Sequence, residues 1–165
     1  MKINSVIFDL DRTLVNLTDF VDWGRAEGLI LRVYVKEGVP ENLVKTFSGR
    51  GLIPLLVNMN EELLKVFPRE RAEMIQAKAY EAMEKCELEG VPSTQLMPGC
   101  PQVLRWLKAH GVKRGIVSFN SDLVVNKILD LHDIGVLIDA VVARDVRYRM
   151  KPHPDQFLLC LEKLG

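Results

Sequence analysis

Short continuous runs of apolar residues occur at three places in the chain, and polar residues follow each run. The runs cover residues 6–8, 115–117 and 138–143. A short apolar run of this kind is typical of a strand buried on both faces in a parallel α/β sheet. The three runs therefore predict the strands of an α/β protein, whose ligands bind beyond the carboxyl ends of the strands.

Between the first and second runs, the apolar residues follow helical spacing instead. Residues 18–36 place apolar side chains mostly at three- and four-residue steps, which predicts a helix ended by Gly38 and Pro40. Residues 41–47 fit a second, short helix. Residues 48–54 contain two glycines and a proline, so they predict a loop.

A longer segment at residues 60–87 is rich in Glu, Lys, Ala and Met, and Pro68 is expected to open its second helix. The inner faces of these helices are expected to carry Leu63, Leu64, Met74, Ala77 and Met83. No strand-like run lies between residues 15 and 91. The pattern therefore predicts an all-helical module inserted between the first strand and the rest of the sheet.

The second half of the chain alternates helical patterns with the remaining apolar runs. An amphipathic helix is expected around residues 103–107 and should end at His110. Further helices are expected at residues 122–129 and 154–164.

The composition limits the size and the partners of the protein. With 165 residues, 48% of them hydrophobic, the chain can bury one core with a small appended module. Lys and Arg together number 22, as do Asp and Glu. This balance argues against nucleic acid or a charged membrane surface as the main partner.

The chain also lacks the features of a secreted or membrane protein. No apolar run approaches the roughly 20 residues of a membrane helix, and no apolar targeting region follows a basic segment. Cys86, Cys100 and Cys160 are widely spaced and form no C-x-x-C motif, which fits a reducing compartment. We therefore expect a soluble, cytoplasmic protein whose cysteines are buried or incidental.

The candidate chemistry begins at Asp9 and Asp11, directly after the first apolar run. Two carboxylates this close repel each other, so they need a cation, for which Mg²⁺ is the usual choice, or they share a proton. Either state suits a pair in which one carboxylate attacks an electrophile and the other transfers protons. The alternative is structural, with both aspartates capping the turn after the strand.

The wider pattern Asp9-x-Asp11-x-Thr13-Leu14 after a strand resembles the first motif of the haloacid dehalogenase superfamily, whose members are mostly phosphatases. The resemblance implies that Asp9 is a nucleophile that becomes aspartyl phosphate, and that Asp11 is the general acid and base. Thr13 is expected to contact the substrate. The family usually has Gly at the position of Arg12. Members that dehalogenate lack the second Asp, so Asp11 favours phosphate chemistry.

Two later segments extend the resemblance to the second and third motifs. Ser118 closes the second apolar run, where a serine can offer its hydroxyl and its backbone N–H to a phosphate oxygen. Asn120 is expected to continue the phosphate contacts. Lys151 precedes Pro152, which keeps it out of the helical region, and its ammonium could neutralise phosphoryl charge. The alternatives are a helix-capping serine and a solvated surface lysine.

The helical module resembles the cap of superfamily members whose cap follows the first motif, a group that includes phosphoglycolate phosphatases and β-phosphoglucomutases. The resemblance implies a Rossmann-like parallel-sheet core domain at residues 1–15 and 91–165 and a helical cap domain at residues 16–90. Arg50 would then face the site and bind an anionic substrate. The alternative is that residues 48–51 are only a flexible connection.

The fourth motif of the superfamily, an acidic cluster after a further strand, has no counterpart before Gly165. The resemblance then implies a core that is incomplete at its C-terminus, with Mg²⁺ held weakly by Asp9 and the backbone carbonyl of Asp11. The first strand would lie at an exposed edge, which can pair with another chain. We therefore expect a truncated product or a homo-oligomer formed through this edge.

Together these features predict a Mg²⁺-dependent phosphatase that acts on a small phosphorylated metabolite through an aspartyl-phosphate intermediate. Transfer to a sugar hydroxyl instead of water would make the protein a phosphomutase, and the missing motif would suit a non-catalytic binding protein. A signalling receiver domain is disfavoured, because its phosphorylated Asp lies on a middle strand well into the chain.

Overall fold

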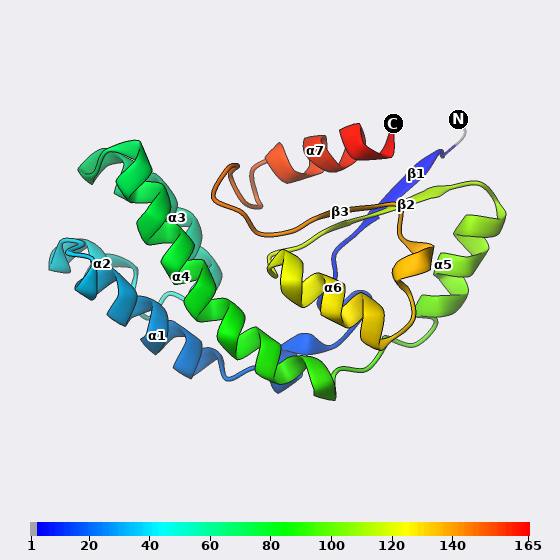
Figure 1. Cartoon of the computed structure of the whole chain (residues 1–165), viewed down its shortest axis with the longest axis horizontal. Helices are drawn as coiled ribbons and strands as arrows, with labels where there is room; N and C mark the ends of the chain where they lie inside the picture. The colour runs from blue at the N-terminus through cyan, green and yellow to red at the C-terminus, as the bar shows by residue number, and fades with distance from the viewer. Residues whose placement is uncertain (1–2) are drawn as a thin grey trace. The chain divides into compact units, whose positions relative to one another are not determined.

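The computed structural model describes residues 3–165, which include a three-stranded parallel sheet (Figure 1). The strands are β1 (Ser5–Phe8), β2 (Lys113–Val117) and β3 (Ala140–Val142), and their order in the sheet is β1-β2-β3. Both strand pairs are parallel. The carboxyl ends of the three strands therefore meet at one edge of the sheet.

The position of β1 in the sheet differs from one expectation and agrees with another. Among the described strands only β2 pairs with β1, so β1 is an edge strand, as the resemblance implied. All four of its residues are partly exposed, so the expectation of a strand buried on both faces is wrong for β1. β2 lies between the two other strands and is buried from Arg114 to Val117. β3 is shorter than the expected run of residues 138–143, and a 3-10 helix at Gly135–Leu137 precedes it.

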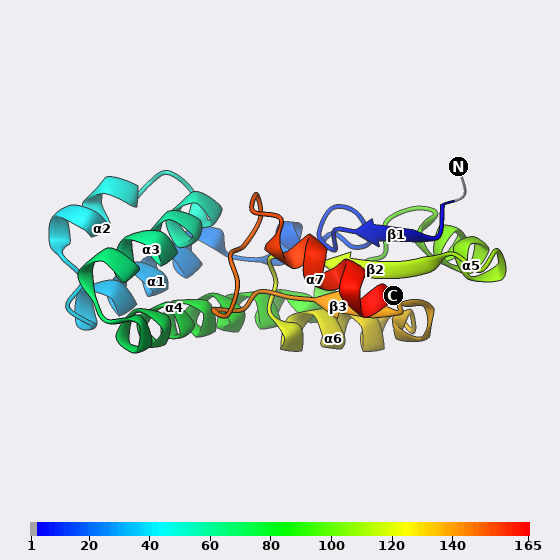
Figure 2. The same ribbon diagram turned by 90° about the horizontal axis from the view of Figure 1, so that it is seen from above.

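Three helices cover the two faces of the sheet. Helix α7 (Asp155–Leu164) lies on one face, and α5 (Cys100–Ala109) and α6 (Asp122–Leu131) lie on the other (Figures 1 and 2). All three helices were expected from the sequence, although α5 begins earlier than expected. Helical crossovers of this kind are what parallel strands require.

The close packing of α7 on the sheet depends on a glycine in β2. Gly115 lies opposite Ile7 of β1 and Ala140 of β3. A Cβ atom at Gly115 would lie 2.5 Å from Cys160 Sγ and 3.1 Å from a methyl group of Leu164, both on α7. A larger residue at this position would therefore push α7 away from the sheet.

Between β1 and α5 the described chain forms four α-helices and no strand. They are α1 (Trp23–Lys36), α2 (Glu41–Phe47), α3 (Leu52–Val66) and α4 (Arg69–Gly90). This confirms the predicted fold class, an α/β parallel-sheet core with an inserted helical module. None of the described helices is both long and apolar enough to cross a membrane.

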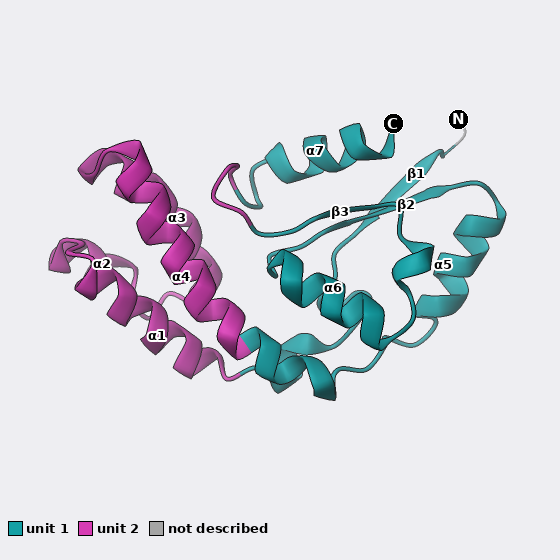
Figure 3. Ribbon diagram, in the orientation of Figure 1, with its two compact units in different colours: residues 1–21, 87–144, 150–165 teal, residues 22–86, 145–149 magenta. Residues whose placement is uncertain are grey.

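The residues divide into two compact units (Figure 3). One unit contains the sheet and comprises residues 1–21, 87–144 and 150–165. The other, the helical unit, comprises residues 22–86 and 145–149.

Two expected boundaries within the helical module are wrong. The single helix expected at residues 18–36 is interrupted: Leu17–Phe20 forms a 3-10 helix, and α1 begins after Asp22, whose side chain accepts a hydrogen bond from Arg25 N at 2.9 Å. The loop expected at residues 48–54 is shorter, because α3 already begins at Leu52. Pro68 precedes α4, as expected.

The helical unit has its own hydrophobic core. Helix α3 contributes four buried apolar residues at helical spacing: Leu55, Leu56, Met59 and Leu63. Of the residues expected on inner faces, Leu63 and Met83 are buried, but Leu64 is 47% exposed and Met74 is 37% exposed. On α4 the neighbouring Ile75 is buried in place of Met74. The expected inner face is therefore confirmed at Leu63 and Met83 and wrong at Leu64 and Met74, and Ala77 is partly buried.

Candidate functional site

Asp9 lies at the carboxyl end of β1, where the chain leaves the sheet. Its Oδ1 atom accepts a hydrogen bond from Leu10 N at 2.8 Å, and its side chain is 49% exposed. Leu10 is fully buried, and its carbonyl oxygen accepts hydrogen bonds from Leu14 N at 2.8 Å and Val15 N at 3.1 Å. Hydrogen bonds to the buried Leu10 backbone therefore hold the turn that presents the Asp9 carboxylate to solvent.

Asp11 belongs to the same turn, but its carboxylate has a different environment. One carboxylate oxygen accepts a hydrogen bond from Thr18 N at 3.0 Å, and the other accepts one from the Thr18 hydroxyl. Thr18 was not identified as a site residue from the sequence, because it lies seven residues after Asp11 and outside the motif. Thr13 is exposed in this turn, beside Arg12 with its left-handed φ of 59°.

Lys151 lies against the carboxyl ends of β1 and β2. Its Nζ atom is 3.0 Å from Asp9 Oδ2 and 3.3 Å from the carbonyl oxygen of Val117, to which it donates. The same atom lies 5.3 Å from the centre of the Phe119 ring, and the lysine side chain is only 17% exposed. The structure thus brings together Asp9 of the first predicted motif and Lys151 of the third, and the two side chains form an ion pair.

Ser118 and Asn120 lie at the end of β2 and are both buried. The Ser118 hydroxyl donates to Asn120 Oδ1 at 2.9 Å and accepts from Asn120 N at 3.1 Å. The Ser118 N–H donates to the Val142 carbonyl oxygen at 3.0 Å. This N–H, which we expected to face a phosphate oxygen, is therefore engaged in the sheet, and the hydroxyl is the group of Ser118 that can rotate towards a ligand.

A buried ion pair that the sequence analysis missed supports Asn120. Arg144 donates from Nη1 and Nη2 to the two carboxylate oxygens of Glu87, both at 2.9 Å, and both side chains are almost fully buried. Asn120 Nδ2 donates to Glu87 Oε1 at 2.9 Å, and Arg144 Nη1 also donates to the Phe119 carbonyl oxygen at 2.7 Å. Arg144 lies two residues after the end of β3, and this position near a strand end was the signal available in the sequence.

Arg50 lies in the helical unit, in the connection between α2 and α3. It is exposed, and its guanidinium carbon lies 5.8 Å from the centre of the Phe47 ring. Because Arg50 and the strand-end residues belong to different units, its place in the site stays a prediction.

The described residues contain no group of three or more His, Cys, Asp or Glu side chains that could hold a metal ion. The chain nevertheless offers two oxygen donors of the kind that Mg²⁺ prefers, the half-exposed carboxylate of Asp9 and the backbone carbonyl of Asp11. Mg²⁺ commonly keeps several water ligands, so two protein oxygens are compatible with it. The residues present therefore fit Mg²⁺ by the chemistry of their donors.

All three cysteines are buried, which makes a thiol nucleophile a poor alternative. Burial raises the pKa of the Cys100 and Cys160 thiols above their usual range. These thiols therefore stay protonated at neutral pH, and a protonated thiol is a weak nucleophile.

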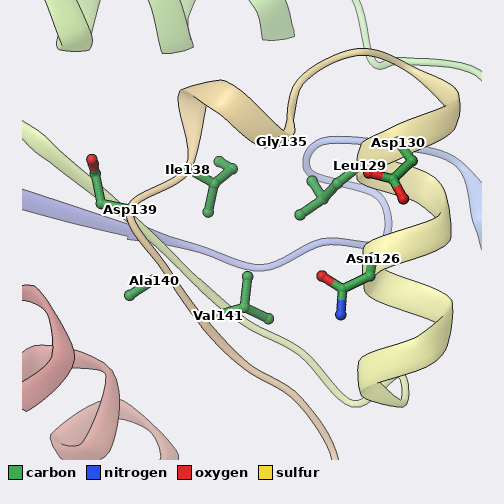
Figure 4. Close-up of a pocket in the computed structure, with 8 residues that line it drawn as sticks. All are labelled: Asn126, Leu129, Asp130, Gly135, Ile138, Asp139, Ala140 and Val141. Atoms are coloured by element: carbon green, nitrogen blue, oxygen red, sulfur yellow. The ribbon is translucent and has the colours of Figure 1, made fainter.

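A pocket beside β3 and α6 is separate from these residues (Figure 4). Asn126, Asp130, Asp139 and Val141 are among the residues that line it, and none of the predicted site residues does. The Asp139 carboxylate accepts hydrogen bonds from Arg114 N at 2.6 Å and from Arg114 Nη2 at 3.0 Å. The Asp139 carboxylate therefore stabilises the N-terminal end of β2.

Comparisons with known proteins show the family of the chain. A family model described as a haloacid dehalogenase-like hydrolase matches residues 3–165. The chain is 31% identical to a phosphoglycolate phosphatase of Aquifex aeolicus over 161 residues, which cover 97% of this chain and 70% of that protein. It is 29% identical to the pyrophosphatase PpaX of Bacillus cereus over 164 residues, which cover 99% of this chain and 70% of that protein.

Solved structures show the same fold at lower identity. A predicted phosphatase from Clostridium acetobutylicum superposes with a TM-score of 0.61 at 18% identity, covering 99% of this chain and 71% of that one. A subfamily IA hydrolase of the same superfamily from Geobacter sulfurreducens superposes with a TM-score of 0.54 at 21% identity, covering 99% and 73%. The family model covers all described residues, and the identity to the Aquifex aeolicus protein is 31%. The chain therefore belongs to the haloacid dehalogenase-like hydrolases.

Proposed function

We propose that this protein is a Mg²⁺-dependent phosphatase that hydrolyses a small phosphorylated metabolite through an aspartyl-phosphate intermediate. The observation that carries the proposal is the Lys151 ammonium, 3.0 Å from the half-exposed carboxylate of Asp9 at the carboxyl ends of the strands. The names of two relatives, a phosphoglycolate phosphatase and a pyrophosphatase, support phosphate cleavage as the reaction class.

In the first step, a carboxylate oxygen of Asp9 attacks the phosphorus atom, and the bond from phosphorus to the leaving oxygen breaks. Asp11 gives its proton to that leaving oxygen. In the second step, Asp11 takes a proton from water, the water oxygen attacks phosphorus, and inorganic phosphate leaves while Asp9 is regenerated. Lys151 neutralises the charge on the transferring oxygens, and Thr18 holds the Asp11 carboxylate in place.

Three further residues are proposed to bind the substrate. The Ser118 hydroxyl rotates from Asn120 towards a phosphate oxygen, and the Asn120 amide, held by Glu87, then contacts the same group. Thr13 is exposed in the turn that carries Asp9. When bound at Asp9 and Asp11, Mg²⁺ would offset the negative charge of the nucleophile and the phosphoryl group.

The domain organisation is part of this proposal. In this proposal the catalytic core domain comprises residues 1–15 and 91–165 and the cap domain residues 16–90, although residues 16–21 and 87–90 lie in the sheet unit and residues 145–149 in the helical unit. The cap domain excludes water and contacts the substrate's leaving group. In this arrangement Arg50 faces the site, where its guanidinium binds an anionic part of the substrate.

The test is hydrolysis of a generic aryl phosphate by the purified chain, with Mg²⁺ and with a chelator. We expect activity that requires Mg²⁺ and disappears in Asp9→Asn. Asp19→Asn is the matched control, because Asp19 is an exposed aspartate whose ion contact with Arg12 is long, at 3.9 Å. An inactive, folded wild-type chain, or an Asp9→Asn variant as active as the wild type, would overturn the proposal.

A further inference from the structure

Gln156 is a fully buried glutamine in the first turn of α7. Its amide group contacts three separate backbone segments. Oε1 accepts a hydrogen bond from Lys151 N at 3.1 Å. Nε2 donates to the Ser118 carbonyl oxygen at 3.1 Å and to the Ala143 carbonyl oxygen at 3.2 Å. One side chain therefore joins the ends of β2 and β3 to the turn that carries Lys151.

A buried amide is unfavourable unless its polar atoms are satisfied, and an apolar side chain would pack at this helix position without that requirement. Here both polar atoms of the Gln156 side chain have partners. The hydrogen bonds connect the backbones of two residues with proposed roles at the phosphate, Ser118 and Lys151. A buried glutamine is therefore an unusual residue for packing alone, but it is suited to fixing the distance between the Ser118 turn and the Lys151 turn.

The contacts of Lys151 show what this distance controls. At its tip, Nζ is held by Asp9 Oδ2 at 3.0 Å and by the Val117 carbonyl oxygen at 3.3 Å. At its base, the backbone N–H is held by Gln156. Without the contact at the base, the ammonium would depend on its tip contacts alone, which the arrival of a phosphoryl group would disturb.

We propose that Gln156 is a positioning residue for the phosphoryl-transfer reaction, which holds Lys151 and the Ser118 turn at the separation that the transferring group requires. The inference rests on the proposed phosphatase function. It goes beyond that function in assigning a role to a buried residue that touches neither the substrate nor the reacting atoms.

The first variant is Gln156→Met, which keeps an unbranched side chain of similar volume and removes all three hydrogen bonds. Because a misplacement of about 1 Å can cost about a hundredfold in rate, we expect kcat for the aryl phosphate to fall by roughly ten- to a hundredfold. KM should change by less than about threefold, since Gln156 does not touch the substrate.

The chain offers a matched control in Gln76, a second fully buried glutamine that lies in the helical unit. Its Nε2 donates to the Leu56 carbonyl oxygen at 3.1 Å, and its Oε1 accepts from the Tyr34 hydroxyl at 3.1 Å. Gln76→Met should lower the midpoint of urea unfolding, as Gln156→Met does, but should leave kcat within about twofold of the wild type.

A second variant, Gln156→Glu, gives a readout that a general loss of stability does not explain. A protonated carboxyl group has one acceptor and one O–H donor, so it can keep the contact with Lys151 N and one of the two donated hydrogen bonds, whereas a carboxylate can donate to neither Ser118 nor Ala143. The ratio of variant to wild-type kcat should therefore rise as the pH is lowered from about 8 to about 5, with circular dichroism confirming the fold at each pH.

The outcomes separate this inference from the function on which it rests. An inactive wild-type chain overturns both. An active wild type with an unaffected Gln156→Met variant overturns only the positioning role, and so does an equal loss of kcat in Gln156→Met and Gln76→Met. If Gln156→Met does not fold, the Gln156→Glu ratio decides, because a ratio that stays flat with pH overturns the role.

Discussion

Two aspartates one residue apart, Asp9 and Asp11, have distinct surroundings in this protein. The Asp9 carboxylate is half exposed and faces an ammonium, whereas both oxygens of Asp11 are engaged by Thr18. Different surroundings are how one pair of identical side chains takes two roles, nucleophile and proton carrier. The assignment of roles to this pair therefore depends on Thr18 as much as on the aspartates.

Thr18→Val tests that dependence, because valine has nearly the shape of threonine and lacks its hydroxyl. Without the hydroxyl, Asp11 loses one of the two contacts that orient it, so we expect kcat for an aryl phosphate to fall by about tenfold or more. KM should stay nearly constant. Thr46→Val is the matched control, because the Thr46 hydroxyl donates to the Asn42 carbonyl oxygen on the exposed face of α2. Equal activity in the two variants would remove Thr18 from the mechanism.

Arg12 occupies a backbone conformation that glycine adopts more easily. Its φ is 59°, in the left-handed region, and its side chain is 71% exposed. Arg12→Gly should therefore raise the free energy of unfolding by up to about 1 kcal/mol, measured by urea denaturation. Arg105→Gly, at an exposed helical position of α5, should lower it by a similar amount. If both variants were less stable than the wild type, the left-handed φ of Arg12 would not be a cost that glycine relieves, and the prediction would be wrong.

At the scale of elements, the Glu87–Arg144 pair joins the last turn of α4 to the segment that follows β3. Both charged groups are almost completely buried and both guanidinium nitrogens that donate to Glu87 have good geometry. Removing one partner of a buried pair leaves the other charge uncompensated. We therefore expect Arg144→Met to lower the free energy of unfolding by about 3–5 kcal/mol, measured by urea denaturation.

The control for this prediction is an arginine in an exposed ion pair. Arg147 donates to Asp145 from a side chain that is 80% exposed, and water replaces such a contact easily. Arg147→Met should leave the urea midpoint nearly unchanged. If Arg144→Met behaves in the same way, the buried pair is not a determinant of stability.

The sequence predicted elements and strand ends better than it predicted the side chains that support them. The apolar runs located the three strands, and the strand-end rule led to Asp9 and Ser118, because both signals are local. The break before α1 was missed, since residues 17–20 carry no proline or glycine to mark it. Glu87 and Gln156 were missed for another reason. Their roles arise from hydrogen bonds to residues that are distant in the chain.

At the scale of the whole molecule, each of the two compact units buries apolar residues of its own. The helical unit buries Leu55, Met59 and Ile75 among its own helices, and the sheet unit buries Ile116 and Val117 between its two helical layers. All four residues of the edge strand β1 are only partly buried, so its outer edge is a place where further burial would add stability.

We expect the chain to self-associate through this edge. Among the described strands β1 pairs only with β2, its residues are partly exposed, and Ile3 just before it is 63% exposed. An open strand edge with exposed apolar residues is a template for pairing with a second chain. Sedimentation velocity should therefore show a dimer whose fraction rises with protein concentration.

Ile3→Lys should weaken association by about tenfold or more, because a lysine at an edge opposes strand pairing. Val136→Lys, at a 79% exposed residue in the 3-10 helix before β3, should not weaken it. A monodisperse monomer at every concentration would contradict the prediction, and so would equal effects of the two lysines, since association would then not involve the β1 edge.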